Sequence, residues 1–441
     1  MPEKAILDQV KIGICGLGTV GYGSYLVLAE NKEEIARRAG CEVVVSHIGT
    51  RSVKPEQEVG DTRVSANVFA VADDPEVDIV LELIGGEDLA KDLVLRAVNN
   101  GKHVVTANKA LIAVHGNEIF EAAARNNVCV AYEAAVAGGI PVIKAVREGM
   151  AANRIEWLAG IINGTGNFIL TEMRDKGSEF ADVLRQAQKL GYAEADPTFD
   201  VEGIDAAHKL TILASIAFGI PLQFEKAYTE GITQVTIEDI HYAKELGYRI
   251  KHLGIARNTD HGIELRVHPT LISEEKLIAN VDGVMNAVMV QGNAVGPTMY
   301  YGAGAGALPT ASAVVADVVD VVRVMDHPQS AVPTLAFQND HISDTPVLGI
   351  SEIESAYYLR IAAEDKAGVL SDITEILGDH SINIEAVIQK EPRDHDAQQV
   401  LSVIILTHEI KEAVMIDAIG KIEALEAVSG NVSRIRMDKL E

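Results

Sequence analysis

From residue 10 to about residue 133, short runs of β-branched residues alternate with stretches that carry apolar residues at helical spacing. The runs that predict buried parallel strands are 10–15, 42–49, 78–85, 102–107 and 128–133. The stretches that predict helices between them are 19–38, 87–99 and 109–126. Strands that alternate with helices indicate an α/β fold with a doubly wound, Rossmann-type parallel sheet. We assign residues 1–133 to this domain.

The pattern changes after residue 133. Residues 134–308 mix helical stretches with strands that do not alternate regularly, which indicates an α+β domain with a mixed or antiparallel sheet. Its helices are predicted at 168–176, 180–190 and 204–218, and its strands at 154–164, 249–258, 262–272 and 281–292. The long apolar helix predicted at 309–325 is expected to pack back on the first domain.

Residues 326–354 contain Pro328, Pro333 and Pro346 among polar residues, which is typical of a linker. The remaining residues, 355–441, predict a strand-helix-strand-strand-helix-strand order. These elements are expected at 357–365, 368–380, 382–391, 400–409, 411–425 and 432–437. This is the order of a ferredoxin-like βαββαβ domain.

Charge and composition narrow the classes of function. Acidic residues outnumber basic residues 64 to 38, which gives a formal net charge of −26 and disfavours binding to nucleic acids and anionic membranes. No apolar run reaches the roughly 18 residues that span a bilayer, and the first ten residues do not resemble a signal peptide. We therefore expect a cytoplasmic protein. Cys15, Cys41 and Cys129 are too scattered for a disulfide framework or a zinc site, so we expect buried free thiols.

A glycine motif follows the first predicted strand. Gly16 would permit a tight turn, Gly18 would let the backbone approach a pyrophosphate, and Gly21 would allow close packing of the helix on the strand. The first helical residues, Thr19 and Val20, would present backbone N–H groups to the phosphates. A plain structural turn is the alternative, but the strand, helix and βαβ context favour a dinucleotide site.

The end of the second predicted strand bears on the choice of cofactor. An NAD site usually carries Asp or Glu there, whereas this chain has Thr50 and Arg51. A guanidinium suits the 2′-phosphate of NADP, so we expect NADP(H) to be preferred, with NAD(H) possible. The alternative for Arg51 is a solvated loop arginine.

A second group of candidates surrounds an acidic loop at 191–203. The group consists of Glu194, Asp196, Asp200, Asp205 and Lys209. Asp205 and Lys209 are four residues apart, so they share one face of the helix predicted at 204–218. Elsewhere such a pair is most often a surface salt bridge worth under about 1 kcal/mol. The adjacent acidic loop and the apolar continuation of the helix favour a functional role, whereas packing or exposure suits His208 better.

Two further segments are candidates for the cofactor site. Thr106 and Lys109 stand at the carboxyl end of a predicted parallel strand, where doubly wound sheets bind ligands. A lysine at a helix N-terminus is unfavourable, which raises the odds that Lys109 is functional. The glycine-rich segment 302–306, with Gly304 and Gly306, enters a helix and would close over the nicotinamide end of a cofactor.

These motifs together resemble the homoserine dehydrogenase family, in its monofunctional bacterial form with a C-terminal ACT domain. The matching segments are GICGLGTVG, TANKALIA, YEAAVAGGIP, INGTGNFIL, GYAEADPTFDVEGIDAAHKL and GAGALPTASAVVAD. The resemblance implies NAD(P)-dependent interconversion of L-aspartate 4-semialdehyde and L-homoserine, in the biosynthesis of threonine, methionine and isoleucine. It also implies a homodimer or homotetramer.

The resemblance assigns roles to single residues. Lys209 resembles the family's catalytic proton donor, Asp205 the carboxylate at the substrate hydroxyl, and Glu194 the carboxylate at its ammonium group. Asp200 lies in the same substrate-binding loop, and Gly191 lies where cofactor and substrate meet. Lys109 resembles a strand-end lysine near the reacting oxygen and the nicotinamide ribose.

The resemblance also implies a cation site and a regulatory site. The stretch EAAVAGGIP resembles a loop that binds Na⁺ or K⁺ through oxygens of Glu133, Val136, Gly138 and Ile140, although an ordinary tight turn has the same sequence features. In the ACT domain, the implied ligand L-threonine would bind where two segments meet. Those segments contribute Asp365, Gly368, Val369, Leu370, Asn383 and Ile384. The alternatives are an ACT domain that only dimerises, and a regulatory amino-acid-binding protein on an inactive dehydrogenase scaffold.

Overall fold

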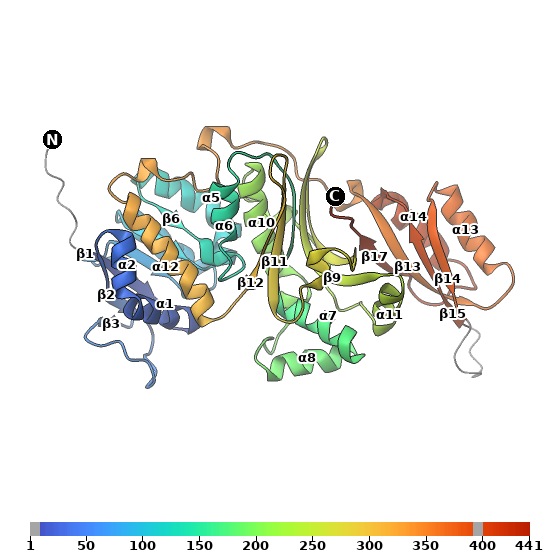
Figure 1. The fold of residues 1–441 in the computed structure, drawn as a ribbon, viewed down its shortest axis with the longest axis horizontal. Coiled ribbons are helices and arrows are strands. Elements are labelled where there is room, and N and C mark those ends of the chain that lie inside the picture. Colours follow the sequence, from blue (N-terminus) through green and yellow to red (C-terminus); the bar gives the residue numbers. More distant parts are fainter. Residues whose placement is uncertain (1–8, 391–399) are drawn as a thin grey trace. The chain divides into compact units, whose positions relative to one another are not determined.

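The computed structural model describes residues 9–390 and 400–441, which form two compact units (Figure 1). Within the described residues, unit 1 contains 9–158, 207–225 and 285–345, and unit 2 contains 159–206, 226–284, 346–390 and 400–441. Strand β7 (Ile155–Ile161) and helix α10 (Ile204–Phe218) carry the chain from one unit into the other. The segment in which we expect no signal peptide, up to residue 8, lies outside the described residues, as does residue 391 of the strand predicted at 382–391.

The sheet of unit 1 is parallel throughout and has the order β3-β2-β1-β4-β5-β6. Its strands are β1 (Gln9–Cys15), β2 (Glu42–Gly49), β3 (Arg63–Ser65), β4 (Ile79–Glu82), β5 (His103–Thr106) and β6 (Val130–Ala131). This order is that of dinucleotide-binding folds and confirms the predicted doubly wound sheet. The sequence pattern missed β3, which is short and mostly exposed.

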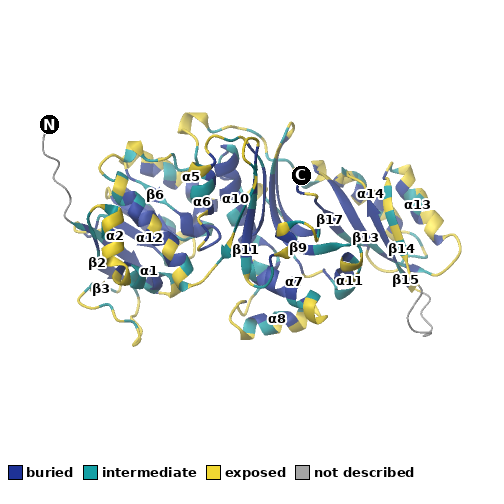
Figure 2. Ribbon diagram, viewed as in Figure 1, coloured by how far each residue is buried: buried dark blue, intermediate teal, exposed yellow. Residues whose placement is uncertain are grey.

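Helices cover both faces of this sheet. One face packs on α1 (Thr19–Glu30), α2 (Lys32–Ala39) and α12 (Ala307–Val324), and the other packs on α3 (Phe69–Ala72), α4 (Asp88–Asn99) and α5 (Lys109–Asn126). The helix predicted at 19–38 is interrupted at Asn31, which caps α2. The helix predicted at 309–325 is α12, and it packs so closely on α1 that a Cβ on Gly23 would lie 2.7 Å from the Ala307 carbonyl oxygen. Figure 2 shows the strands buried and the outer helix surfaces exposed.

Shorter elements complete unit 1. They are η1 (Glu133–Ala135), α6 (Val142–Lys144), the π-helical turn η2 (Ala145–Gly149), the hairpin strands β11 (Met285–Gly292) and β12 (Gly296–Ala303), and the turns η5 (Pro328–Ser330) and η6 (Asn339–His341). The sequence pattern missed β12, because its residues are half-exposed and include Gly296 and Pro297.

Unit 2 combines two parts. The first, residues 159–206 and 226–284, carries the acidic loop to which the resemblance assigns a substrate role, and we call it the substrate-loop part; the second is the C-terminal βαββαβ segment. Its first part contains α7 (Gly164–Lys176), α8 (Phe180–Lys189), α9 (Thr198–Val201), β8 (Tyr228–Thr229), α11 (Ile237–Glu245), β9 (Tyr248–Thr259), β10 (Gly262–Ser273) and η4 (Leu277–Asn280). Its second part contains η7 (Ile350–Glu352), β13 (Glu354–Glu364), α13 (Val369–Asp379), β14 (Ile384–Gln389), β15 (Val400–Thr407), β16 (Ile410–Lys411), α14 (Glu412–Glu423) and β17 (Ser433–Met437). The predicted βαββαβ order is therefore confirmed.

The two parts of unit 2 share one sheet and one core. The strand path runs β9-β10-β17-β13-β15-β14, and the two parts meet where β10 and β17 pair in parallel, with Thr270 opposite Arg436. Apolar side chains from both parts, among them Ile169, Val201, Tyr358 and Ile435, belong to the same cluster. The βαββαβ segment is therefore built into unit 2. Across residues 9–390 and 400–441, no helix is long and apolar enough to cross a membrane.

Candidate functional site

The glycine loop between β1 and α1 leaves open space at one glycine and none at the other two. A Cβ on Gly16, whose φ is +92°, would lie 2.6 Å from the Leu83 carbonyl oxygen, and one on Gly21 would lie 1.9 Å from the Gly16 carbonyl oxygen. A Cβ on Gly18 would meet no described atom within 4 Å. Gly18 is the N-cap of α1. The first turn of α1, which begins with Thr19 and Val20, contains no acidic residue that would repel a phosphate. The loop therefore fits a bound diphosphate on its open side.

The end of β2 lies beside this loop. The Gly16 N–H donates to the Gly49 carbonyl oxygen (2.8 Å), and Arg51 lies exposed two residues beyond the strand. The Gln57 side chain donates to the Leu17 carbonyl oxygen (2.8 Å), so residues near 57 also reach the glycine loop. The sequence analysis missed Gln57, because an isolated glutamine in a polar loop carries no motif.

The carboxyl ends of β4 and β5 are organised by a buried acid that the sequence analysis also missed. Glu82 is 0% exposed; it accepts hydrogen bonds from the Thr106 hydroxyl (2.6 Å) and the Ile84 N–H (3.0 Å). Burial raises the pKa of Glu82, and these hydrogen bonds oppose that shift. Asn108 caps α5 by accepting from the Leu111 N–H (3.1 Å), which puts Lys109 at the first helical position as predicted. The sequence did carry a signal for Glu82, because it is an acidic residue inside the apolar run 78–85.

The glycine-rich segment before α12 packs on the predicted cation loop. A Cβ on Gly138, whose φ is +51°, would lie 2.5 Å from the Gly304 carbonyl oxygen. Gly306 has a φ of +127° and is the N-cap of α12. The two loops therefore need glycine in order to pack this closely on each other. This packing is consistent with a segment that closes over a cofactor and also with a tight structural turn.

In the predicted cation loop, the Glu133 carboxylate already accepts hydrogen bonds from the backbone. Its two oxygens accept from the backbone N–H groups of Ile143 and Lys144, both at 2.9 Å, and so cap α6. The Glu133 N–H donates to Asp317 (2.7 Å), and burial raises the pKa of Glu133 to about 7. The oxygens left for a cation are main-chain carbonyls such as those of Val136 and Gly138. No group of three or more His, Cys, Asp or Glu that could hold a metal occurs within 9–390 and 400–441.

The substrate-loop candidates converge in unit 2 on an asparagine. The Asn163 side-chain amide donates to Asp200 Oδ1 and to Asp205 Oδ2, both at 2.8 Å, while its carbonyl oxygen accepts from the Gly166 N–H (2.7 Å) and caps α7. Asn163 is 6% exposed and Asp205 is 4% exposed. We call Asn163, Asp200 and Asp205 the carboxylate cluster. The motif INGTGNFIL contained Asn163, but its capping position gave no hint that it also binds both acids.

Helix α10 starts at Ile204 and ends at Phe218, as predicted, so Asp205 and Lys209 stand one turn apart on it. Lys209 is half-buried, and His208 is buried with its ring stacked on Phe224 at 4.0 Å, which confirms the packing role expected for it. Gly191 and Glu194 are exposed on the loop before α9, so the structure does not bring them into the buried cluster.

The predicted regulatory residues lie around the start of α13 and of β14. Gly368 has a φ of +101° and is the N-cap of α13; a Cβ there would meet no described atom within 4 Å. Asp365, Leu370 and Asn383 are exposed, Ile384 is half-buried and Val369 is buried. The backbone at Gly368 is therefore accessible to a ligand.

The cysteines have the properties of structural thiols. Cys15 is buried, whereas Cys41 and Cys129 are half-buried, so the expectation of full burial was wrong for these two. Burial raises the pKa of Cys129 to about 11 and also raises the pKa of Cys15 and of Cys41. A thiol that stays protonated is a poor nucleophile.

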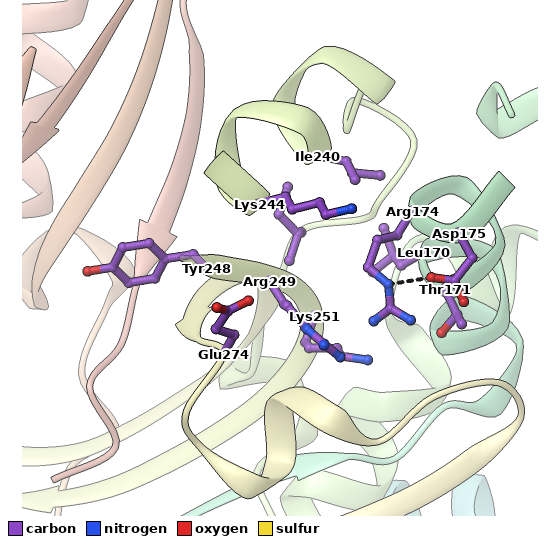
Figure 3. A pocket seen from close by; sticks show the side chains of 11 residues that line it. Leu170, Thr171, Arg174, Asp175, Ile240, Lys244, Tyr248, Arg249, Lys251 and Glu274 are labelled. Atoms are coloured by element: carbon purple, nitrogen blue, oxygen red, sulfur yellow. Dashed lines mark hydrogen bonds and ion pairs between the residues drawn. The ribbon is translucent and has the colours of Figure 1, made fainter. Parts of the chain in front are cut away.

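A separate cavity of about 340 Å³ in unit 2 contains none of the predicted site residues (Figure 3). Its cations have structural partners: Arg174 binds Asp175 (2.7 Å) and Asp282 (2.9 Å), and Lys251 binds Asp282 (3.0 Å). Arg174 lies in the last turn of α7 and Lys244 in the last turn of α11, where a positive charge offsets the helix dipole. We therefore leave this cavity outside the candidate site.

Comparisons with known proteins find one family across this chain. The family model "Homoserine dehydrogenase" matches residues 141–319, its NAD binding domain matches 16–133, and the ACT domain matches 357–427. The homoserine dehydrogenase of Pseudomonas aeruginosa is 65% identical over 98% of this chain and 100% of its own. A solved structure of a homoserine dehydrogenase from Thiobacillus denitrificans has a TM-score of 0.94 at 62% identity, covering 98% of this chain and 99% of its own.

A more distant solved structure, a hyperthermophilic archaeal homoserine dehydrogenase in complex with NADPH, covers 71% of this chain and 97% of its own. Its TM-score is 0.60 at 27% identity. Together with the closer matches, it confirms the resemblance that the sequence motifs carried.

Proposed function

The chain belongs to the homoserine dehydrogenase family, and we propose that it interconverts L-aspartate 4-semialdehyde and L-homoserine with Lys209 as proton donor and acceptor. It is an oxidoreductase with a Rossmann-type NAD-binding domain and an ACT domain. The observation that carries the proposal is the carboxylate cluster. Asn163 holds Asp205 at the start of α10, one helical turn before Lys209.

The proposed mechanism follows from the residue types. A bound nicotinamide would supply the hydride for reduction of the aldehyde or accept it in the reverse direction. Lys209 donates a proton to the oxygen on which negative charge develops, and in the reverse direction neutral Lys209 accepts the hydroxyl proton. Homoserine oxidation should therefore be favoured at higher pH.

The other site residues would bind and orient the substrate. Asp205 binds the hydroxyl end, and Asp200 belongs to the same substrate-binding loop. Glu194 on its exposed loop takes the ammonium group, and Gly191 borders the cofactor. Lys109, at the end of β5, would lie near the reacting oxygen and the nicotinamide ribose. The raised pKa of Cys15 and of Cys129 argues against a covalent thiol mechanism such as that of aspartate-semialdehyde dehydrogenases.

We propose NADP(H) as the preferred cofactor. The support is Arg51 in place of an acid beyond β2, and the NADPH in the archaeal relative's structure. The cofactor contacts would come from Gly16, Gly18, Thr19, Val20 and Gly21 in the glycine loop. NAD(H) remains an alternative, because the exposed Arg51 leaves room for a 2′-hydroxyl.

The remaining proposals concern partners and regulation. A monovalent cation would bind the carbonyl oxygens of the 133–140 loop, and L-threonine would bind near Gly368 and Asn383 and inhibit the enzyme. We also propose a cytoplasmic homodimer or homotetramer in the threonine, methionine and isoleucine pathway. An inactive regulatory scaffold is the second candidate function, but the presence of Asp205 and Lys209 weighs against it.

The decisive experiment follows the absorbance of NADPH after the protein is mixed with NADP⁺ and L-homoserine. We expect Lys209→Ala to lower turnover by about 10²–10⁴-fold, the range for loss of a general acid. Binding of NADP⁺ should be nearly unchanged. The matched control is Lys439→Ala, which removes an exposed lysine near the C-terminus. Wild-type turnover in Lys209→Ala would refute the assignment of Lys209, and no turnover in the wild type would refute the proposed reaction.

A further inference from the structure

A buried arginine joins the two parts of unit 2. Arg436, on β17, is 0% exposed and binds Glu412 of α14 through two nitrogens, at 2.9 and 2.6 Å. Its third nitrogen donates to Glu230 Oε2 at 2.8 Å, so it reaches from the βαββαβ segment into the substrate-loop part. Burial alone would raise the pKa of Glu230, but the charges of Arg436 and Arg434, with hydrogen bonds from Arg436 and Tyr228, hold it below its usual value. Glu230 is therefore a carboxylate fixed by a buried cation.

The backbone of Glu230 is fixed as firmly as its side chain. Its N–H donates to the Val267 carbonyl oxygen (2.8 Å), and its own carbonyl oxygen lies 3.0 Å from His252 Nε2. Two residues further on, the Ile232 N–H donates to the Val201 carbonyl oxygen (2.9 Å). The segment 230–232 thus binds directly to the turn that precedes α10.

His252 lies beneath the two turns that hold the carboxylate cluster. A Cβ on Gly203 would lie 3.1 Å from His252 Cε1, and one on Gly166 would lie 3.5 Å from His252 Nδ1. Gly203 immediately precedes α10 and Asp205, and the Gly166 N–H donates to Asn163. The ring is 5% exposed, and burial lowers its pKa to about 4, so it is neutral near pH 7. The ring therefore packs against the turns that carry Asn163 and Asp205.

We propose that Arg436 is a positioning residue for Asp205, acting through Glu230 and His252. This inference rests on the proposed function, because it assigns a purpose to the substrate-binding carboxylate. It also links the βαββαβ segment to the carboxylate cluster indirectly, because Arg436 belongs to the last strand of that segment and binds Glu230.

Unit 2 offers a matched control at the same junction. Arg360 of β13 donates to the fully buried Asp239 of α11 at 2.7 and 3.2 Å. This pair also ties the βαββαβ segment to the substrate-loop part, but the hydrogen-bond partners of Asp239 are Thr236, Tyr358, Arg360 and Ser433. None of these belongs to the carboxylate cluster or to the turn before α10. Breaking it should destabilise unit 2 without displacing Asp205.

The test measures steady-state kinetics of the full-length chain with L-homoserine and NADP⁺. We expect Glu230→Gln to raise KM for homoserine by about three- to thirtyfold, the range for coupling through packed side chains, and to leave KM for NADP⁺ unchanged. Asp239→Asn should leave both KM values unchanged although it lowers the melting temperature. Equal changes of KM for homoserine in the two variants, or no change in Glu230→Gln, would overturn the proposal.

A second pair keeps the test decisive if Glu230→Gln does not fold. His252→Gln retains an amide that can donate to the Glu230 carbonyl oxygen, whereas His252→Leu does not. We expect His252→Leu to raise KM for homoserine and His252→Gln to restore most of the loss; equal effects would refute the proposal. A wild-type enzyme without homoserine oxidation would instead refute the proposed function itself.

Discussion

The glycine loop of unit 1 and the carboxylate cluster of unit 2 are built by different means. In unit 1, the glycine loop depends on missing side chains, since Gly16 and Gly21 have no room for a Cβ and Gly18 leaves space open. In unit 2, the carboxylate cluster depends on side chains. The ion pairs Arg436–Glu230 and Arg360–Asp239, each with one fully buried partner, join the two parts of the unit. A site built from backbone tolerates little local change, whereas a site held by buried charges depends on distant residues.

The largest effect is expected when unit 2 loses its C-terminal part. A chain that ends at residue 350 lacks Arg360 and Arg436, which leaves the buried Asp239 and the half-buried Glu230 without their cations. Breaking a buried ion pair costs about 3–5 kcal/mol, so we expect the free energy of unfolding to fall by more than about 3 kcal/mol. Urea unfolding measures this change.

A double substitution in the shortened chain is the control for this prediction. Asp239→Asn with Glu230→Gln removes the unpaired charges and should recover part of the loss. A shortened chain as stable as the full-length protein would show that the ion pairs do not join the two parts energetically.

The second prediction separates the two roles of glycine in unit 1. Gly21→Ala places a Cβ 1.9 Å from the Gly16 carbonyl oxygen, so we expect a loss of stability of about 1–3 kcal/mol together with weaker cofactor binding. Gly18→Ala should leave stability almost unchanged, because the space beside it is open, yet raise KM for the cofactor. Thermal unfolding and cofactor titration measure the two effects. Equal destabilisation by the two substitutions would contradict this division.

The same contrast explains what the sequence could predict. The strands of the parallel sheet except β3, and the long helices α4 and α5, followed from local periodicity, and the bounds of α5 and α10 were correct. The glycine loop was also visible, because its residues are consecutive and its chemistry lies in the backbone. The fold class and the family were therefore predictable from the chain alone.

The rest depended on contacts between distant residues. Nothing in the local pattern pairs β10 with β17, and nothing places Asn163 against both Asp200 and Asp205. The same is true of Glu82, whose Thr106 partner lies on a neighbouring strand. Side-chain networks of this kind form only when the fold is complete, so sequence motifs do not reveal them.

The third prediction compares how the stability of the two regions depends on pH. The pKa of His252 is about 4 in the folded state, against about 6.5 in an unfolded chain, so its contribution to stability is lost as pH falls from 6.5 to 4. This contribution amounts to about 3 kcal/mol at most. Glu82 in unit 1 behaves oppositely: its raised pKa favours the folded state at low pH, and that contribution is lost as pH rises.

Urea unfolding at pH 7 and pH 5 measures the pH effect. We expect the wild type to be less stable at pH 5 and His252→Gln to lose part of that difference, because glutamine does not titrate. Hydrogen exchange should place the loss in β9 and β10 of unit 2 rather than in β4 of unit 1. An unchanged pH dependence in His252→Gln would contradict the assignment of this effect to the buried ring.

The smallest effect is expected at Arg51, the one side chain on which the cofactor edge of unit 1 is proposed to rely for specificity. Arg51→Ala should raise KM for NADP⁺ about tenfold, since an exposed charge-assisted contact is worth about 1.4 kcal/mol, and it should change KM for NAD⁺ by less than about twofold. Arg125→Ala, which removes an exposed arginine from α5, is the matched control for net charge. Steady-state kinetics with each cofactor gives the comparison. Equal changes for NADP⁺ and NAD⁺ would show that Arg51 does not bind the 2′-phosphate, and cofactor choice would then depend on backbone geometry as well.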